Sequence, residues 1–209
     1  VMNIHDLCFV VNPHWYSFSF YTVYNLLIPR LARRATRVIT NSNNSRNDLL
    51  QYCGVEASKV NMIYWAVDEV FLASKVDQKT YDRLFDCEYI LYVGSLEPRK
   101  NIRTLVKSFE KFRELNPDKK TKLVLIGGES PLFGDVRLKA QKFDDDVVFK
   151  GYVSDAELRA FYRNAAVVVY PSLYEGFGFP PIEAMASGAA VITSDCSSLP
   201  EVVGDAAIQ

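Results

Sequence analysis

Short apolar runs alternate with helical patterns along the second half of this 209-residue chain. The runs fall at positions 89–93, 122–126, 146–149, 165–170 and 189–192. Runs of this length and apolar content are typical of strands that are buried on both faces of a sheet. Because these strands alternate with helices, the pattern predicts an α/β fold with a parallel, doubly wound sheet. Ligands of such sheets bind beyond the carboxyl ends of the strands, so the loops after these runs carry the candidate site residues.

The chain divides into two blocks joined by a polar stretch. The first block, residues 1–71, is predicted to hold strands over 1–4, 37–40 and 60–64, an aromatic loop, and helices over 18–35 and 45–52. Residues 72–86 lack an apolar period, which indicates a connector and a domain boundary. The second block, residues 87–209, contains the five apolar runs. Within it, Ser154-Asp-Ala-Glu157 is a capping-box pattern that predicts a helix start.

Composition and charge exclude several classes of function. The formal net charge is −1, which gives no reason to expect a nucleic-acid partner. The four scattered cysteines lack metal-ligand spacing, so we expect reduced thiols and a cytoplasmic location. No apolar run reaches membrane-spanning length, and no signal-peptide pattern opens the chain. The first residues already have the pattern of a strand, so we expect the chain to begin inside a domain.

The most informative stretch, residues 170–188, reads YPSLYEGFGFPPIEAMASG. It predicts the end of a strand, a loop with Gly176 and Gly178, and a helix whose first turn holds the two prolines and which ends at the final glycine. A glycine loop before a helix N-terminus suits phosphate groups. Glu175 lies before the loop and Glu183 is expected in the first helical turn, where carboxylates can accept hydrogen bonds from sugar hydroxyls. The combination indicates a nucleotide sugar; the alternative is a structural turn with incidental acids.

This string resembles the Glu-x7-Glu signature of retaining glycosyltransferases of family 4, which have the GT-B fold. That fold has two Rossmann-like, doubly wound domains, and the resemblance covers nearly the whole chain. It implies that residues 1–71 are the last third of the acceptor domain. Residues 87–209 would be most of the donor domain without its final helices. The glycine-containing loop that opens the acceptor domain of this family is absent, so we expect an incomplete N-terminal domain that further polypeptide completes.

The loop after the 89–93 strand carries the cations expected to meet a diphosphate. In the family, an Arg follows the glycine directly and a Lys comes five residues later; Lys100 matches the Lys, whereas Ser95 stands where the Arg is expected. The neighbouring Arg99 is the alternative cation. Positive charge here would stabilise the leaving diphosphate, a task that metals perform in other enzymes. The structural alternative, solvated charges at a helix start, is disfavoured because cations oppose the helix dipole there.

The resemblance assigns further contacts to the donor. Glu183 would accept from the ribose and Glu175 from the transferred sugar. The base would lie against main-chain atoms of residues 151–153. His5 ends the first strand and would touch the donor sugar, with Asp6 as an orienting residue; a structural histidine is the alternative. The catalytic candidates are His5, Lys100 and Glu175, and the donor-binding candidates are Gly94, Ser95, Arg99, Lys100, Gly128, Tyr152, Val153, Gly176, Phe177, Gly178, Phe179 and Glu183.

The implied activity is transfer of a hexose from a UDP- or GDP-sugar to a glycan or lipid-linked acceptor in polysaccharide biosynthesis, with retention and without metal or cofactor. The acidic run at residues 144–146 is interpreted as solvated charge. A glycosidase would place two carboxylates on either side of the scissile bond, which this loop does not suggest. Two other functions stay open, namely a phosphorylase or hydrolase on the same fold and a non-catalytic nucleotide-sugar-binding module.

Residues 13–37 combine aromatic side chains with four arginines. This composition is compatible with an interfacial or lipid-linked-acceptor surface, which would place the protein peripherally at the inner face of the membrane. The alternative, which we favour slightly, is an ordinary amphipathic helix with arginines that extend to solvent.

Overall fold

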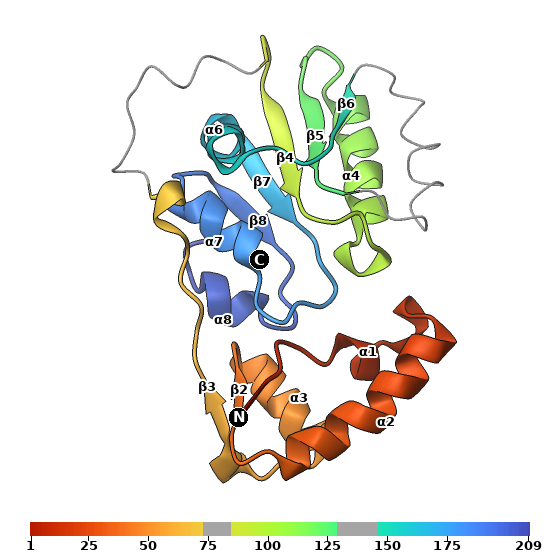
Figure 1. Cartoon of the computed structure of the whole chain (residues 1–209). Coiled ribbons are helices and arrows are strands. Elements are labelled where there is room, and N and C mark those ends of the chain that lie inside the picture. Colours follow the sequence, from red (N-terminus) through yellow and green to blue (C-terminus); the bar gives the residue numbers. More distant parts are fainter. Residues whose placement is uncertain (73–84, 129–145) are drawn as a thin grey trace. The chain divides into compact units, whose positions relative to one another are not determined.

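The computed structural model describes residues 1–72, 85–128 and 146–209, which form two compact units (Figure 1). The first unit consists of Val1–Ala66, Tyr174–Gly178 and Asp195–Val202. The second consists of Val67–Leu173, Phe179–Ser194 and Val203–Gln209. Two short segments of the predicted donor domain thus belong to the same unit as the N-terminal block. Most of the predicted connector, residues 73–84, lies outside the described residues, and the predicted domain boundary stays a prediction.

The first unit contains a parallel sheet in the order β1-β2-β3. Its elements are β1 (Met2–Asn3), α1 (Cys8–Val11), the 3-10 turn η1 (Pro13–Trp15), α2 (Phe18–Arg34), β2 (Val38–Thr40), α3 (Asn43–Cys53), the 3-10 turn η2 (Ala57–Lys59) and β3 (Val60–Met62). The short helix α1 and the two 3-10 turns were not predicted. Side chains of β2, α2 and α3, among them Val38, Ala32 and Leu49, are buried in one apolar cluster.

Local sequence explains where the two main helices of this unit begin and end. The Ser17 hydroxyl accepts a hydrogen bond from Phe20 N at the start of α2, and the Ser42 hydroxyl accepts one from Ser45 N at the start of α3. Helix α3 ends at Gly54, whose φ of 61° is the left-handed conformation that glycine adopts readily.

The second unit is a five-stranded parallel sheet in the order β6-β5-β4-β7-β8, which confirms the doubly wound α/β class (Figure 1). Its strands are β4 (Tyr89–Val93), β5 (Lys122–Ile126), β6 (Val147–Lys150), β7 (Val167–Tyr170) and β8 (Val191–Thr193). Its helices and turns are η3 (Glu69–Phe71), η6 (Pro98–Lys100), α4 (Ile102–Leu115), α6 (Asp155–Asn164) and α7 (Phe179–Ala186). The short helix α8 (Leu199–Val203) belongs to the first unit except for its last residue.

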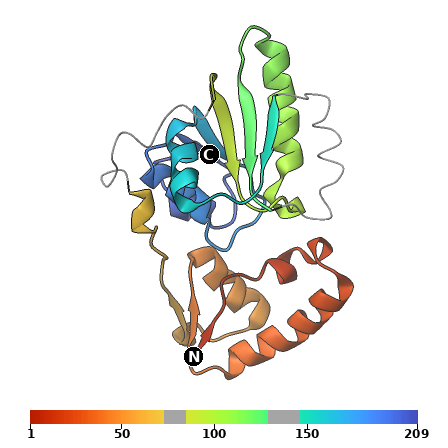
Figure 2. The same cartoon turned by 45° about the horizontal axis from the view of Figure 1, so that its top comes forward.

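Helices cover both faces of this sheet (Figure 2). On one face, α6 and α7 bury Phe161, Tyr162 and Ala184 in a cluster with residues of β4, β5, β7 and β8. The apolar stripe of α4, which includes Leu105 and Phe109, lies outside that cluster and is also buried. Helix α6 begins with the predicted capping box, in which both reciprocal hydrogen bonds between Ser154 and Glu157 form.

Helix α2 exposes several large apolar side chains. Pro29 and Ala32 are its buried residues, whereas Leu26, Leu27 and Leu31 are each about half exposed. Among the described residues, no helix is long and apolar enough to cross a membrane. Peripheral membrane contact through residues 13–37 stays a prediction, and absence of binding to anionic lipid vesicles in a flotation assay would contradict it.

Two glycines at the carboxyl edge of the second sheet pack closely, and this packing can be tested by mutation. A Cβ atom on Gly127, whose φ is 141°, would lie 2.1 Å from the carbonyl oxygen of Gly94. We expect Gly127→Ala to lower the free energy of unfolding by about 2–4 kcal/mol, because backbone must move at a strained φ. The matched control is Gly151→Ala, where a Cβ would meet nothing within 4 Å. Equal stability of the two variants in urea denaturation would contradict this packing.

Candidate functional site

The strand order of the second unit reverses between β4 and β7. From β4 the chain proceeds to β5 and β6 on one side, and it returns to β7 and β8 on the other side. In doubly wound sheets this reversal opens a crevice at the carboxyl ends of the strands. The loops that follow β4 and β7 are joined there, since Leu173 N donates a hydrogen bond of 2.8 Å to Arg99 O. Two segments predicted to bind the donor therefore meet where α/β sheets bind ligands.

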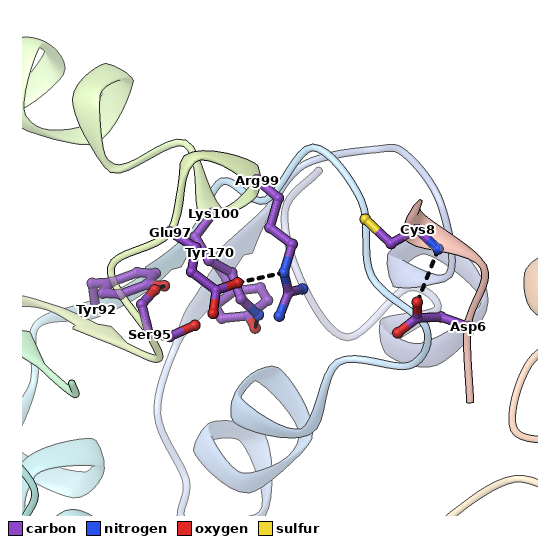
Figure 3. A network of polar contacts seen from close by, with 8 residues as sticks. All are labelled: Asp6, Cys8, Tyr92, Ser95, Glu97, Arg99, Lys100 and Tyr170. Atoms are coloured by element: carbon purple, nitrogen blue, oxygen red, sulfur yellow. Dashed lines mark hydrogen bonds and ion pairs between the residues drawn. The ribbon is translucent and has the colours of Figure 1, made fainter. Parts of the chain in front are cut away.

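Lys100 places a buried positive charge at this edge. It ends the turn η6 after β4, and it is only 6% exposed. Its Nζ donates a hydrogen bond of 2.7 Å to the hydroxyl of Tyr170, the last residue of β7, and lies 5.1 Å from the centroid of that ring (Figure 3). Burial of an ammonium group is unfavourable unless polar or anionic groups surround it. The position therefore suits an anionic ligand such as a diphosphate.

The other predicted residues of this loop have different environments (Figure 3). Arg99 is partly exposed, and its Nε pairs with Glu97 Oε2 at 2.8 Å. The carbonyl of Ser95 accepts a hydrogen bond of 3.0 Å from the Tyr92 hydroxyl. Because Ser95 carries no charge, Arg99 is the second cation of the loop beside Lys100.

A pocket of about 320 Å³ lies at the ends of β5 and β6. It is lined by Leu96, Gly127, Gly128, Phe149, Lys150, Gly151 and Tyr152. Such a volume lies at the lower end of the range for small-molecule sites. Of the residues predicted to contact the nucleotide here, Gly128 and Tyr152 line the pocket. Val153 does not; it packs instead against the apolar core of the second unit.

Glu183 lies in the second turn of α7 and not in the first turn, where it was predicted. The helix begins at Phe179, so Glu183 is its fifth residue and no acid occupies the first turn. Its Oε2 accepts a hydrogen bond of 3.0 Å from the hydroxyl of Tyr162 on α6. Burial raises the pKa of Glu183 above its ordinary value, the hydrogen bond from Tyr162 opposes this rise, and repulsion from Asp155 and Asp68 adds to it. The carboxylate is therefore a poorly solvated acceptor, which suits hydroxyl donors of a ligand.

The remaining candidates, His5 and the loop that contains Glu175, belong to the first unit. His5 is exposed, and its ring centroid lies 4.7 Å from that of Trp65. The Oδ1 atom of Asp6 accepts a hydrogen bond of 2.9 Å from Cys8 N, so this carboxylate orients the backbone at the start of α1 (Figure 3). A Cβ atom on Gly176 would lie 2.7 Å from His5 O, so the structure brings these two segments into contact.

The loop at residues 174–178 is held by hydrogen bonds within the first unit. The Tyr174 hydroxyl donates to Asp48 Oδ2 at 2.6 Å. Burial raises the pKa of Asp48, although the hydrogen bond from Tyr174 opposes this effect. Glu175 is 6% exposed, and Gly178 has a φ of 113°, a conformation that favours glycine. The loop is thus fixed before any ligand binds.

Sequence reasoning missed the residues that support the predicted ones. Tyr170 and Tyr162 contact Lys100 and Glu183 through their hydroxyl groups. The tyrosine that ends an otherwise all-valine strand was the available signal for Tyr170. Nothing in the local pattern distinguishes Tyr162 from a core aromatic residue.

Within residues 1–72, 85–128 and 146–209, no group of three or more His, Cys, Asp or Glu side chains is arranged to hold a metal ion. Two residues of the acidic run, at positions 144 and 145, lie outside these ranges.

Comparison with known proteins gives consistent results. The sequence model of the group 1 glycosyl transferases matches residues 81–208. The serotype-specific mannosyltransferase WbdA of Escherichia coli is 32% identical over 181 residues, which are 82% of this chain and 22% of that protein. The O-antigen chain mannosyltransferase RfbU of Salmonella typhimurium is 29% identical over 216 residues, which are 99% of this chain and 55% of that protein. The chain thus spans about a fifth to a half of these relatives.

Solved structures show the same fold. Sucrose-phosphate synthase from Thermosynechococcus elongatus superposes with a TM-score of 0.77 at 27% identity, over 95% of this chain and 51% of that one. Anabaena HepE in complex with UDP and glucose also superposes with a TM-score of 0.77. Its sequence identity is 20%, and the match covers 95% of this chain and 53% of that one. The likeness to these GT-B glycosyltransferases confirms the predicted fold.

The raised pKa of Glu183 predicts a stability effect with a definite sign. The folded state favours the protonated acid, so its contribution to stability is full below the ordinary pKa of 4.5 and is lost as the pH rises through the folded-state value. We expect Glu183→Gln to be more stable than wild type at pH 7, with a difference that shrinks towards pH 4. Hydrogen bonds from Ser154 lower the pKa of Glu157. The pH dependence of the stability difference for Glu157→Gln should therefore have the opposite sign. Urea denaturation at several pH values measures both, and a pH-independent difference at Glu183 would contradict the assignment.

Proposed function

Because the chain belongs to the group 1 glycosyl transferases, we propose that it transfers a hexose from a UDP- or GDP-sugar to a glycan or lipid-linked acceptor. The proposal includes retention of the anomeric configuration and turnover without a metal ion. The relatives WbdA and RfbU are named mannosyltransferases, so mannose is the first hexose to test. UDP-glucose is the second, because the fold is shared with HepE, which was solved with UDP and glucose.

The observation that carries the proposal is the buried cation at the end of β7, the strand that precedes the Glu-x7-Glu segment in the sequence. Lys100 ends the turn after β4, and its ammonium group reaches the end of β7. The loop after β7 leads through Glu175 to α7, where Glu183 is a poorly solvated acceptor. A buried cation suits a diphosphate, and the two acids suit hydroxyl groups. A nucleotide sugar combines both kinds of group.

The proposed reaction is a substitution on one face of the sugar. The bond between the anomeric carbon and the diphosphate oxygen breaks, and the acceptor hydroxyl oxygen forms a bond to the same face of the oxocarbenium-like sugar. Lys100 stabilises the negative charge that develops on the diphosphate. The acceptor proton passes to the leaving diphosphate, so that no protein base is required. Glu175 and His5 orient the sugar, Glu183 orients the ribose, and the pocket at Gly128 and Tyr152 receives part of the nucleotide.

Two alternative functions, a phosphorylase or hydrolase and a non-catalytic binding module, can be distinguished by assay. A phosphorylase would require free phosphate, and a hydrolase would release free hexose with water alone. A non-catalytic binding module would bind the donor and give no turnover with any acceptor.

The decisive test combines an activity assay with a variant at Lys100. The wild-type protein is assayed with GDP-mannose, UDP-glucose and UDP-galactose, with and without EDTA, and the anomeric configuration of the product is read by NMR. We expect turnover that survives EDTA and gives retention. Lys100→Ala should weaken nucleoside diphosphate binding by about 1.5–3 kcal/mol in calorimetry, because a charged hydrogen bond is lost.

The matched control is Lys119→Ala, which removes an ammonium group that lies 5.7 Å from the ring centroid of Phe112 on α4. This variant should bind nucleotide like wild type. Unchanged nucleotide affinity in Lys100→Ala would overturn the diphosphate site. Activity that disappears with EDTA and returns with manganese would overturn metal-independent transfer.

A further inference from the structure

Three serine hydroxyls hold consecutive carbonyl groups of the loop that carries Glu175. The carbonyl of Glu175 accepts from Ser197 at 2.6 Å and from Ser198 at 3.0 Å. The carbonyl of Phe177 accepts from Ser198 at 2.7 Å, and that of Gly176 accepts from Ser45 at 3.3 Å. Ser197 also accepts a hydrogen bond of 3.0 Å from Glu175 N. All of these residues belong to the first unit, and we name the three serines the serine clamp.

Ser45 differs from the other two because it also holds the segment of His5. Its hydroxyl donates to His5 O at 3.0 Å as well as to Gly176 O, and its side chain is fully buried. A hydroxyl has one proton, so the two carbonyls share it. The backbone segments that carry His5 and Glu175 are therefore anchored at a single atom.

The hydrogen bonds of the Ser45 hydroxyl do not stabilise the start of α3, the helix to which Ser45 belongs. Serines inside helices commonly bond to a carbonyl of the preceding turn. The N-cap of α3 is Ser42, whose side chain accepts from Ser45 N. The bonds of the Ser45 hydroxyl instead join residues that are 40 and 131 positions away in the sequence.

The first turn of α3 also fixes the segment that supplies the other two serines. The carboxylate of Glu201 accepts hydrogen bonds of 2.9 Å from Asn43 N and from Asn44 N. An anion at a helix N-terminus is favoured by the free N–H groups and by the helix dipole. The N-terminal end of α3 therefore contacts the Glu175 loop directly through Ser45. It also binds Glu201, which lies in the segment that carries Ser197 and Ser198.

We propose that Ser45 is a positioning residue for sugar transfer, which sets the spacing between the backbone segments of His5 and Glu175. This inference rests on the proposed function, in which both residues contact the transferred sugar. The nucleotide contacts proposed above, at Lys100 and Glu183, belong to the second unit. Loss of the Ser45 hydroxyl should therefore affect the sugar and leave nucleotide binding nearly unchanged.

The test compares Ser45→Ala with Ser58→Ala in the whole protein. Ser58→Ala removes an exposed hydroxyl that bonds to Glu56 in the same unit, so it controls for the loss of a serine hydroxyl outside the serine clamp. Hydrogen–deuterium exchange of the peptide over residues 172–179, the dissociation constants of UDP, GDP and their hexose conjugates, and kcat and KM are measured for each protein.

In Ser45→Ala we expect faster exchange in the 172–179 peptide and a kcat that is lower by about 10- to 100-fold, the order of loss that a displacement of about 1 Å produces. The dissociation constant of the free nucleoside diphosphate should stay within about twofold of wild type. Ser58→Ala should match wild type in all three measurements. Unchanged exchange in Ser45→Ala, or a kcat equal to wild type, would overturn the proposal.

The same experiment separates this inference from the proposed function. If wild type transfers no hexose from any donor, the proposed function fails. The positioning role of Ser45 is then tested by the ratio of the affinity for the hexose conjugate to the affinity for the free nucleotide. A ratio that falls in Ser45→Ala supports the positioning role, and an unchanged ratio overturns it. If Ser45→Ala does not fold, Ser45→Cys, which replaces the hydroxyl with a weaker donor at the same position, is judged by the same criteria.

Discussion

The reversal of strand order between β4 and β7 is the constraint on which the site depends. The loops that follow parallel strands lie at the same edge of the sheet. Where the strand order reverses, the loops after β4 and β7 lead away in opposite directions and leave a crevice between them. Lys100 and Tyr170 meet there, and the hydrogen bond between Leu173 and Arg99 closes the arrangement. The glycines at the ends of β4 and β5 allow the close backbone packing at this edge.

The Glu-x7-Glu segment has its two acids in different units. Glu175 is fixed by contacts within the first unit, where serine hydroxyls hold its backbone. Glu183 is fixed in the second unit by α7 and by the hydroxyl of Tyr162. In the proposed reaction Glu175 contacts the sugar and Glu183 contacts the ribose, so different sets of residues hold the two contacts in place. A single mutation can therefore impair one contact and spare the other.

Much of this fold could be predicted from the sequence because its elements have strong local signals. The apolar runs at β4 and β5 match the observed strands to the residue, and the capping box at Ser154 starts α6 where predicted. Two prolines suggested the start of α7, but the helix begins one residue earlier at Phe179, which places Glu183 in its second turn. The position of a helix end depends on packing as well as on local sequence, so errors of this size are expected.

The contacts that support the site could not be predicted, because they join residues that are distant in the sequence. The Ser45 hydroxyl bonds to a carbonyl 131 positions away, and the serine residue itself carries no pattern that indicates this use. The burial of Lys100 against Tyr170 likewise depends on the pairing of β4 with β7. The resemblance predicted which residues contact the donor, whereas the structure shows which residues hold some of them in place.

The most direct measurement is a crystal structure of the protein with an intact nucleotide sugar, GDP-mannose or UDP-glucose. We expect a diphosphate oxygen within about 2.7–3.2 Å of Lys100 Nζ and a ribose hydroxyl at hydrogen-bond distance from Glu183. The hexose should lie beside Glu175. A nucleotide bound away from the carboxyl ends of β4 and β7, with no phosphate oxygen near Lys100 Nζ, would contradict this prediction.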